Sequence, residues 1–522
     1  MMRVFRQISA LCLIGWPVLG QAQTSAQAQN AAPLSVIEWL GQQPKVEIPK
    51  SRPPLKPDEA PVAKTALPPA VTVTTLGEGG PRAIGLVPTN VTGLPLDLWA
   101  GSSVAEITTL FDRLPDLHLP AARALFYTLL LAEATAPKGS ASEGDALALA
   151  RVSALIDAGA LDPALSLIEQ AGVATSPDHF DLWMQVSLLL GTEDRACTLL
   201  GQKPFLTSDY SVRILCAARA GNWDMAALTF GSAQALQLLP PERLALLDRF
   251  LNPDLFEGEP LLPTPRTMDA IGFRMFEAIG ERPQTRMLPP AFAVADLRDV
   301  AGWKAQLEAA ERLTRIGALP DNRFLGIYTH REPAASGGIW DRVEALQRFE
   351  TALRTQSADA VSKTLRPAWQ AMQEAELEVS FATLYADALK PIDLQGSVAA
   401  LRDRILLLSP IYESVGAGAP PSPEIAFLAA IASGEAPSTR PDIRQADAIA
   451  SAFSTPTPRQ ALIDQAQNSN LGMAILHTIA LLEEGANGDT AALRDALSTL
   501  RALGLEDFAR RAALQVSLLE RN

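Results

Sequence analysis

Apolar residues recur at helical spacing between Asp145 and Pro240, and three short polar breaks interrupt them. Each break starts with glycine and reaches alanine after four further residues: GALDPA (Gly159–Ala164), GTEDRA (Gly191–Ala196) and GNWDMA (Gly221–Ala226). The second copy starts 32 residues after the first, and the third starts 30 residues after the second. Because an apolar residue at every third or fourth position marks one face of a helix, the pattern predicts a helical hairpin around each break.

The glycine and the alanine of each break have separate structural roles. A glycine that ends the first helix can adopt the left-handed conformation that satisfies the last carbonyl groups. The alanine lies one turn into the second helix, where only a small side chain lets the two helices approach. We therefore expect left-handed glycines and helix-contacting alanines in all three hairpins.

Helical periodicity continues on both sides of these hairpins. A pair of helices is expected upstream, over Val104–Leu114 and Leu119–Ala134, while Pro240 to Pro290 is irregular apart from Thr267–Ile279. The later expected helices are Trp303–Ile316, Trp340–Arg354, a single long helix near Trp369–Leu389, Leu394–Leu408, Leu471–Glu483, Thr490–Leu503 and Leu505–Leu519. The last pair resembles the terminal cap of a repeat array. These segments group into helical regions at 94–260, 261–390 and 391–522.

The composition favours helices throughout the chain. Of the 522 residues, 48% are hydrophobic and 6% are aromatic. Ala and Leu supply most of the apolar content, and both are strong helix formers. A chain of this length exceeds one ordinary core, which predicts two or three domains or one long array. The expected fold is therefore all-α, an α-solenoid of stacked helical hairpins.

The hairpins between Asp145 and Pro240 resemble the tetratricopeptide repeat (TPR), a helix–turn–helix unit of about 34 residues. In the third hairpin, Trp223, Phe230 and Ala233 occupy the family's aromatic, large and second small positions. The first hairpin has Leu161, Ile168 and Ala171 at these positions, whereas the second has Glu193 in place of the turn aromatic. The resemblance covers roughly a fifth of the chain.

The resemblance also implies a concave groove lined by first-helix residues, among them Asp178, Asp181 and Gln185. Concave grooves of helical arrays bind extended peptides or partner helices. An acidic lining would favour a basic segment of the partner. The alternative is that these three residues belong to an ordinary solvated helix face.

The first 22 residues have the pattern of a secretory signal peptide. Arg3 and Arg6 precede an apolar run over Ile8–Leu19, and the small residues Gly20 and Ala22 offer cleavage sites. The run is too short for a permanent transmembrane helix, and no longer apolar run follows it. The chain also has far more Arg than Lys, which suits a GC-rich Gram-negative bacterium. We therefore expect an exported, periplasmic protein without a transmembrane helix after removal of the signal peptide.

Residues 23–93 have the composition of a disordered linker rich in Pro and Ala. Within it, the segment LSVIEWLGQQP at Leu34–Pro44 carries the apolar residues Val36, Ile37, Trp39 and Leu40. This segment is either a docking peptide for a partner or a stretch that packs back on its own chain.

Two cysteines remain once Cys12 is removed with the signal peptide. Cys197 follows the break GTEDRA in the second hairpin, and Cys216 lies just before the break GNWDMA in the third. An even number of cysteines in an oxidising compartment favours a disulfide, and the alternative is two buried thiols. Two isolated cysteines do not suggest a zinc site.

The chain shows no recognisable reaction chemistry. It lacks the common motifs of hydrolases, zinc proteases and phosphate loops. Its four histidines, His118, His179, His330 and His477, have no metal-binding spacing. Ser336 lies near His330 in a glycine-containing loop, but a nucleophile would also need an orienting acid and an oxyanion site. The sequence predicts no catalytic residue, cofactor or metal.

The net charge of −14 argues against a nucleic-acid partner, because an acidic surface repels phosphate and no basic cluster offsets it. The function expected from the sequence is a non-enzymatic scaffold or adaptor that binds another cell-envelope protein. The alternative is a relative of peptidoglycan-binding or peptidoglycan-degrading enzymes that keeps a helical ring without a recognisable catalytic domain.

Overall fold

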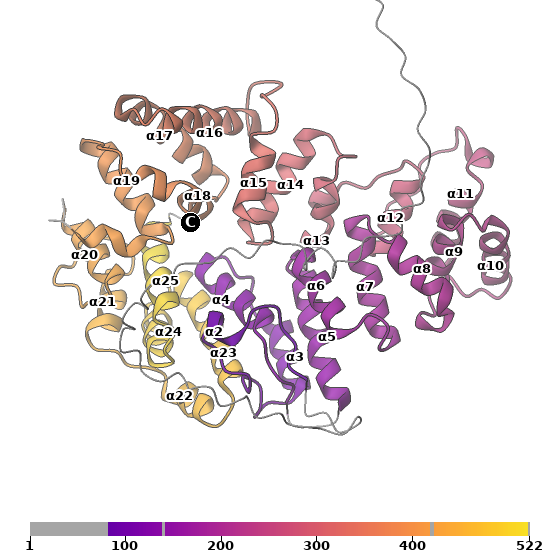
Figure 1. The fold of residues 1–522 in the computed structure, drawn as a ribbon, viewed down its shortest axis with the longest axis horizontal. Coiled ribbons are helices and arrows are strands. Elements are labelled where there is room, and N and C mark those ends of the chain that lie inside the picture. Colours follow the sequence, from indigo (N-terminus) through magenta and orange to yellow (C-terminus); the bar gives the residue numbers. More distant parts are fainter. Residues whose placement is uncertain (1–81, 138–140, 418–421, 520–522) are drawn as a thin grey trace, which may run out of the picture. The chain divides into compact units, whose positions relative to one another are not determined.

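The computed structural model describes residues 82–137, 141–417 and 422–519. The predicted signal peptide and the apolar segment with Val36, Ile37, Trp39 and Leu40 lie outside these ranges. All regular elements of the described residues are helices, and β pairing is limited to two isolated bridges (Figure 1). The predicted all-α fold of packed helical hairpins is confirmed.

The three marked hairpins form as the sequence predicts. Their turn glycines have φ angles of 76°, 76° and 78°, and the three alanines five positions later are all 0% exposed. The glycine and alanine roles inferred from the sequence are therefore confirmed. The six helices are α5 (Ala141–Asp157), α6 (Leu161–Ala171), α7 (Pro177–Leu190), α8 (Asp194–Gln202), α9 (Tyr210–Arg219) and α10 (Trp223–Ala235).

The helical body begins before the expected end of the linker at residue 93. Ile84 pairs with Ala134 and Val87 pairs with Ala132 in the two β-bridges. Ile84 is buried, and so is Trp99 further along. Residues 84–99 thus pack on the body because they gain backbone hydrogen bonds and apolar contacts there. The helices of this part are α2 (Thr89–Thr92), α3 (Val104–Arg113) and α4 (Pro120–Leu131).

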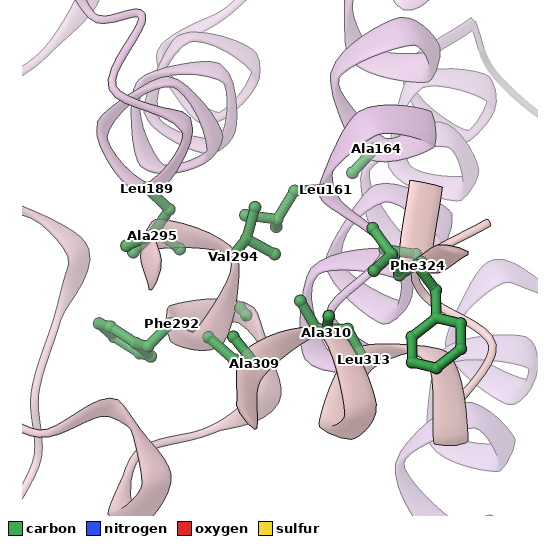
Figure 2. Close-up of a cluster of buried hydrophobic side chains, with 14 of the residues drawn as sticks. Leu161, Ala164, Leu189, Phe292, Val294, Ala295, Ala309, Ala310, Leu313 and Phe324 are labelled. Atoms are coloured by element: carbon green, nitrogen blue, oxygen red, sulfur yellow. The ribbon is translucent and has the colours of Figure 1, made fainter. Parts of the chain in front are cut away.

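The middle region packs on the first hairpins. Figure 2 shows Leu161 of α6 and Leu189 of α7 beside Val294 and Ala295, within a buried apolar cluster that also includes Leu313. The expectation of an irregular stretch from residue 240 to residue 290 is wrong at its start, where α11 forms. The helices are α11 (Pro241–Leu251), α12 (Ala270–Ala278), α13 (Pro290–Ala293), α14 (Trp303–Arg315), α15 (Asp321–Tyr328) and α16 (Ile339–Arg354). Short 3-10 turns lie between them at Pro253–Phe256, Thr285–Met287 and Val294–Leu297, and another lies between α8 and α9 at Pro204–Leu206.

The single long helix expected near Trp369–Leu389 is wrong. Two helices occupy this region, α17 (Ala358–Glu374) and α18 (Glu378–Leu389). Glu376 lies between them with a φ angle of 56°, a left-handed conformation that ends α17. The sequence has no glycine at this turn to mark the break.

The last helices return to the first ones. They are α19 (Gly396–Leu408), a 3-10 turn (Tyr412–Ala417), α20 (Pro423–Ala432), α21 (Ala446–Ser454), α22 (Gln460–Gln467), α23 (Leu471–Ala486), α24 (Thr490–Ala502) and α25 (Glu506–Leu518). Both α23 and α25 contact α4 (Figure 1). The sequence suggested that the last hairpin caps the end of an open array. It instead packs against α4, near the start of the helical body.

Side chains from these last helices also satisfy the start of α4, which has no cap of its own. The carboxylate of Glu483 accepts the backbone N–H of His118 at 2.8 Å and that of Leu119 at 3.2 Å. Gln515 accepts the N–H of Ala121 at 2.7 Å. These bonds supply acceptors for helix N–H groups that would otherwise lack them.

The described residues form two hydrophobic cores. The first core contains buried residues of the hairpins and of the middle region, from Ile84 to Leu408, together with Leu519. The other joins residues 94–147 to residues 407–516. The first helical region expected at 94–260 is thus divided between two cores, because α4 packs on helices more than three hundred residues away in sequence.

Candidate binding cleft

Three adjoining cavities lie among α3, α4, α5, the turns after α14 and α17, and the last helices α23 and α25. Their volumes are about 640, 560 and 290 Å³, and Glu376 lines all three. His118 lines the first and second cavities, while Arg123 and Arg315 line the first and third. We call the three together the central cleft. The largest cavity falls within the range of about 300 to 1,000 Å³ that is usual for ligand pockets.

Apolar side chains form much of the wall of the largest cavity. Phe111 of α3, Leu117 of the following loop and Phe126 of α4 line it on one side, and Ile316 lines it after α14. All four are half-buried. A ligand in this cavity would therefore cover apolar surface that the protein leaves partly exposed to water.

Carboxylates lie among these apolar groups. Asp112, Asp116 and Asp157 line the largest cavity. Partial burial raises the pKa of Asp157 above its usual value, and the negative charge of Asp112 raises it further. A nearby cation would relieve this effect, since an opposite charge favours the ionised carboxylate.

The two smaller cavities add four more carboxylates to these and to Glu376, which lines all three cavities. Glu374, Glu376, Glu378 and Glu483 line the second cavity. Asp321 lines the third, and burial raises the pKa of its carboxyl while a hydrogen bond with Ser380 opposes this shift. The central cleft thus contains eight carboxylates and three arginines.

The three arginines of the cleft bind backbone carbonyl groups. Arg123 donates to the carbonyl oxygens of Leu117 and Arg315, joining α4 to the end of α14. Arg315 Nε donates to the carbonyl oxygen of Ala375 at 2.9 Å. Arg444 donates to that of Ala486, also at 2.9 Å. These cations hold separate segments together, and the cleft keeps an excess of negative charge.

Tyr127 also joins segments at the cleft. Its hydroxyl lies 3.3 Å from the carbonyl oxygen of Ala158 and 3.2 Å from that of Ile316. Burial raises the pKa of Tyr127 to about 12, so the hydroxyl keeps its proton at neutral pH and can donate it.

One buried hydroxyl in the cleft has no protein partner. Thr314 is 4% exposed and lines the third cavity. Its Oγ1 atom makes no hydrogen bond within the described part of the chain. Buried polar groups nearly always have a partner, but this oxygen atom is itself covered by protein and therefore does not offer a contact to a ligand in the cleft.

The predicted groove residues do not line these cavities. Asp178 and Asp181 are exposed on α7, and Gln185 is half-buried one turn further along. Burial raises the pKa of Asp181, a hydrogen bond with Thr207 lowers it, and the charges of Asp209 and Asp178 raise it. These residues belong to a separate acidic face.

The loop with Ser336 and His330 has an ordinary structural explanation. Both side chains are exposed. The backbone N–H of Gly337 donates to Asp341 Oδ1 at 2.8 Å, next to the start of α16. The loop is therefore organised by a contact that does not involve either candidate side chain.

The four histidines lie in different surroundings. His118 Nδ1 lies 3.2 Å from Glu483, and His477 Nδ1 lies 3.2 Å from Gln465. His179 is buried beside Ser176, and burial lowers the pKa of its imidazole. No group of three or more potential His, Cys, Asp or Glu ligands is arranged for a metal within 82–137, 141–417 and 422–519.

Glu193, which departs from the family's turn pattern, is an ionic junction between helices. It is 0% exposed, and its Oε1 atom lies 2.9 Å from Arg219 of α9 and 3.0 Å from Arg274 of α12. The carboxylate thus replaces the apolar contact of a turn aromatic with two charge-assisted contacts. Its role is structural.

The two cysteines of the hairpins form a disulfide in the structure. Cys197 of α8 and Cys216 of α9 have Cα atoms 4.9 Å apart and are separated by 19 residues in sequence. We expect replacement of both by alanine to lower the free energy of unfolding by about 2 to 4 kcal/mol, because the unfolded chain loses a constraint. Thermal unfolding with and without a reducing agent measures this effect. An unfolding midpoint of the wild-type protein that does not respond to reductant would contradict it.

Comparisons with models of known protein families, with curated proteins and with solved structures found no match. None of the helices in the described ranges is long and apolar enough to cross a membrane. The central cleft therefore has to be interpreted from its own geometry and charge.

Proposed function

We propose that this protein is an exported, non-enzymatic scaffold that binds another cell-envelope protein through the central cleft. The observation that carries the proposal is the cleft itself, where three cavities meet at Glu376, the largest has an apolar wall and carboxylates are in excess. Concave surfaces of helical arrays bind segments of other proteins. The signal-peptide pattern of residues 1–22 supports export to the periplasm.

We also propose that α5 to α10 are TPR-like hairpins. The left-handed turn glycines and the fully buried alanines support this assignment. Trp223 departs from it, since it is 52% exposed although its position is that of the family's turn aromatic.

The partners of the charged side chains support a binding role over a reactive one. The arginines of the cleft bind backbone carbonyls, and Glu483 accepts N–H groups at the start of α4. These groups hold α4, α14 and the last helices together. A nucleophile with an orienting base is not assembled among them.

One observation favours a second candidate function, an enzyme that acts on peptidoglycan. Burial raises the pKa of Asp157 in the largest cavity, and the charge of Asp112 raises it further. A carboxyl with a raised pKa beside an ionised one is the pairing used by many glycoside hydrolases. In the scaffold proposal, the same pair attracts a cation.

Incubation of the purified protein with murein sacculi separates these two functions. We expect no release of soluble fragments, and we expect co-purification of a defined envelope protein after reversible cross-linking in cells. A muramidase provides the positive control for fragment release. Release by the wild-type protein that is lost in Asp157→Asn would contradict the scaffold and support the enzyme.

A further inference from the structure

We propose that the central cleft recognises a cationic segment of its protein partner, one that carries Lys or Arg together with apolar residues. This proposal rests on the proposed function and specifies the partner's chemistry. Two features of the cleft carry it: the excess of carboxylates and the apolar wall among them.

The charge distribution favours a cationic ligand. Eight carboxylates face three arginines. Each arginine binds a backbone carbonyl, and Arg315 also lies 4.0 Å from Glu376, but the carboxylates remain in excess. Walls of low polarity strengthen the field of the carboxylates inside the cleft. A bound ammonium or guanidinium group near Asp112 and Asp157 would offset the repulsion between these two acids.

The apolar wall indicates that the ligand has hydrophobic groups beside its positive charge. Phe111, Leu117, Phe126 and Ile316 line the cavity that also contains Asp112 and Asp157. A metal ion or a small inorganic cation would leave this wall exposed to water. An amphipathic peptide segment would cover the wall while its basic residues meet the carboxylates.

Glu376 occupies a position where glycine is the common residue. Its φ angle of 56° ends α17, and its side chain lines every cavity of the cleft. Gln237, Gln356 and Gln445 hold similar left-handed angles elsewhere in this chain. Glu376→Gln therefore keeps a residue that this backbone tolerates, and it removes the negative charge together with its contact to Arg315 at 4.0 Å.

The experiment compares two triple variants that change the net charge equally. The cleft variant carries Asp112→Asn, Asp157→Asn and Glu376→Gln. The control carries Asp224→Asn, Asp254→Asn and Glu257→Gln, at exposed positions of α10 and of the segment after α11. The probe is a fluorescein-labelled amphipathic peptide of Lys, Leu and Ala. Its counterpart has Glu in place of every Lys. Fluorescence anisotropy measures binding, and circular dichroism measures the unfolding midpoint of each variant.

We expect the Lys peptide to bind the wild type and the control alike and to bind the cleft variant about tenfold more weakly, since three charge contacts are lost. The Glu peptide should not bind. Equal weakening in both variants, or equal binding of both peptides, would overturn the proposal. Displacement of the Lys peptide by spermidine at equal concentration would also overturn it, in favour of a small polyamine ligand. If the Lys peptide does not bind but a specific protein cross-links to the cleft in cells, the proposal of a cationic partner segment is refuted. The proposed scaffold function is then retained.

Discussion

Replacement of Arg151 by leucine is expected to lower the free energy of unfolding by about 3 to 5 kcal/mol, among the largest effects in this chain. Arg151 of α5 is 1% exposed and has no carboxylate partner in the described residues. Its guanidinium donates to the carbonyl oxygens of Leu130 at 2.7 Å, Ile84 at 2.8 Å and Ala132 at 2.7 Å. One side chain thus binds three backbone groups around the end of α4.

The substitution leaves these carbonyl groups without a donor from α5. Burial lowers the pKa of Arg151 to about 10, so the group remains charged at neutral pH. Arg151→Lys should have an intermediate effect, because one ammonium cannot span the three acceptors. Urea unfolding measures the change, with Arg348→Leu on an exposed face of α16 as the control. Equal urea midpoints for wild type and Arg151→Leu would refute this account of the junction.

Replacement of Glu193 by alanine is expected to lower the free energy of unfolding by roughly 3 kcal/mol, because two charge-assisted hydrogen bonds to a buried carboxylate are lost, although Arg219 keeps Asp194 and Arg274 keeps Glu277 as a second partner. Arg219 and Arg274 come from α9 and α12, so the change affects the packing of three helices. Thermal and urea unfolding measure it. Arg195→Ala is the control, since its contact with Glu169 is mostly exposed.

Glu193→Phe distinguishes this junction from the repeat family's ordinary turn. The family pattern alone would favour an aromatic residue here and predict a gain in stability. The two ion pairs predict a loss, because phenylalanine cannot accept hydrogen bonds from Arg219 and Arg274. A variant with phenylalanine that is as stable as the wild type would show that the ionic contacts contribute little.

The hairpins could be predicted because their determinants are local. Each turn contains a glycine that ends one helix and an alanine that lets the next helix approach. The break between α17 and α18 could not be predicted in this way, since Glu376 holds a left-handed angle without a glycine. The buried position of Arg151 could not be predicted either, because a single basic residue in an apolar helix run usually lies on its solvated face.

The cleft could not be predicted, because its residues are far apart in sequence. Asp112, Asp157, Asp321 and Glu376 belong to four separate segments that the packing of the middle and last helices brings together. Helical periodicity shows which face of a helix is buried but does not identify its partner helix. The acidic residues on α7 were the nearest local signal, and they lie outside the cleft.

The central claim is that the central cleft holds a segment of another envelope protein. Photo-cross-linking in living cells tests it most directly, with a benzophenone amino acid at Ser153, an exposed residue of α5 that lines the largest cavity. Leu228, 66% exposed on α10, provides the control position outside the cleft. We expect one defined envelope protein cross-linked from Ser153 through a segment with Lys or Arg and apolar residues, and none from Leu228. The same adduct from both positions, or glycan fragments as the only product at Ser153, would contradict the claim.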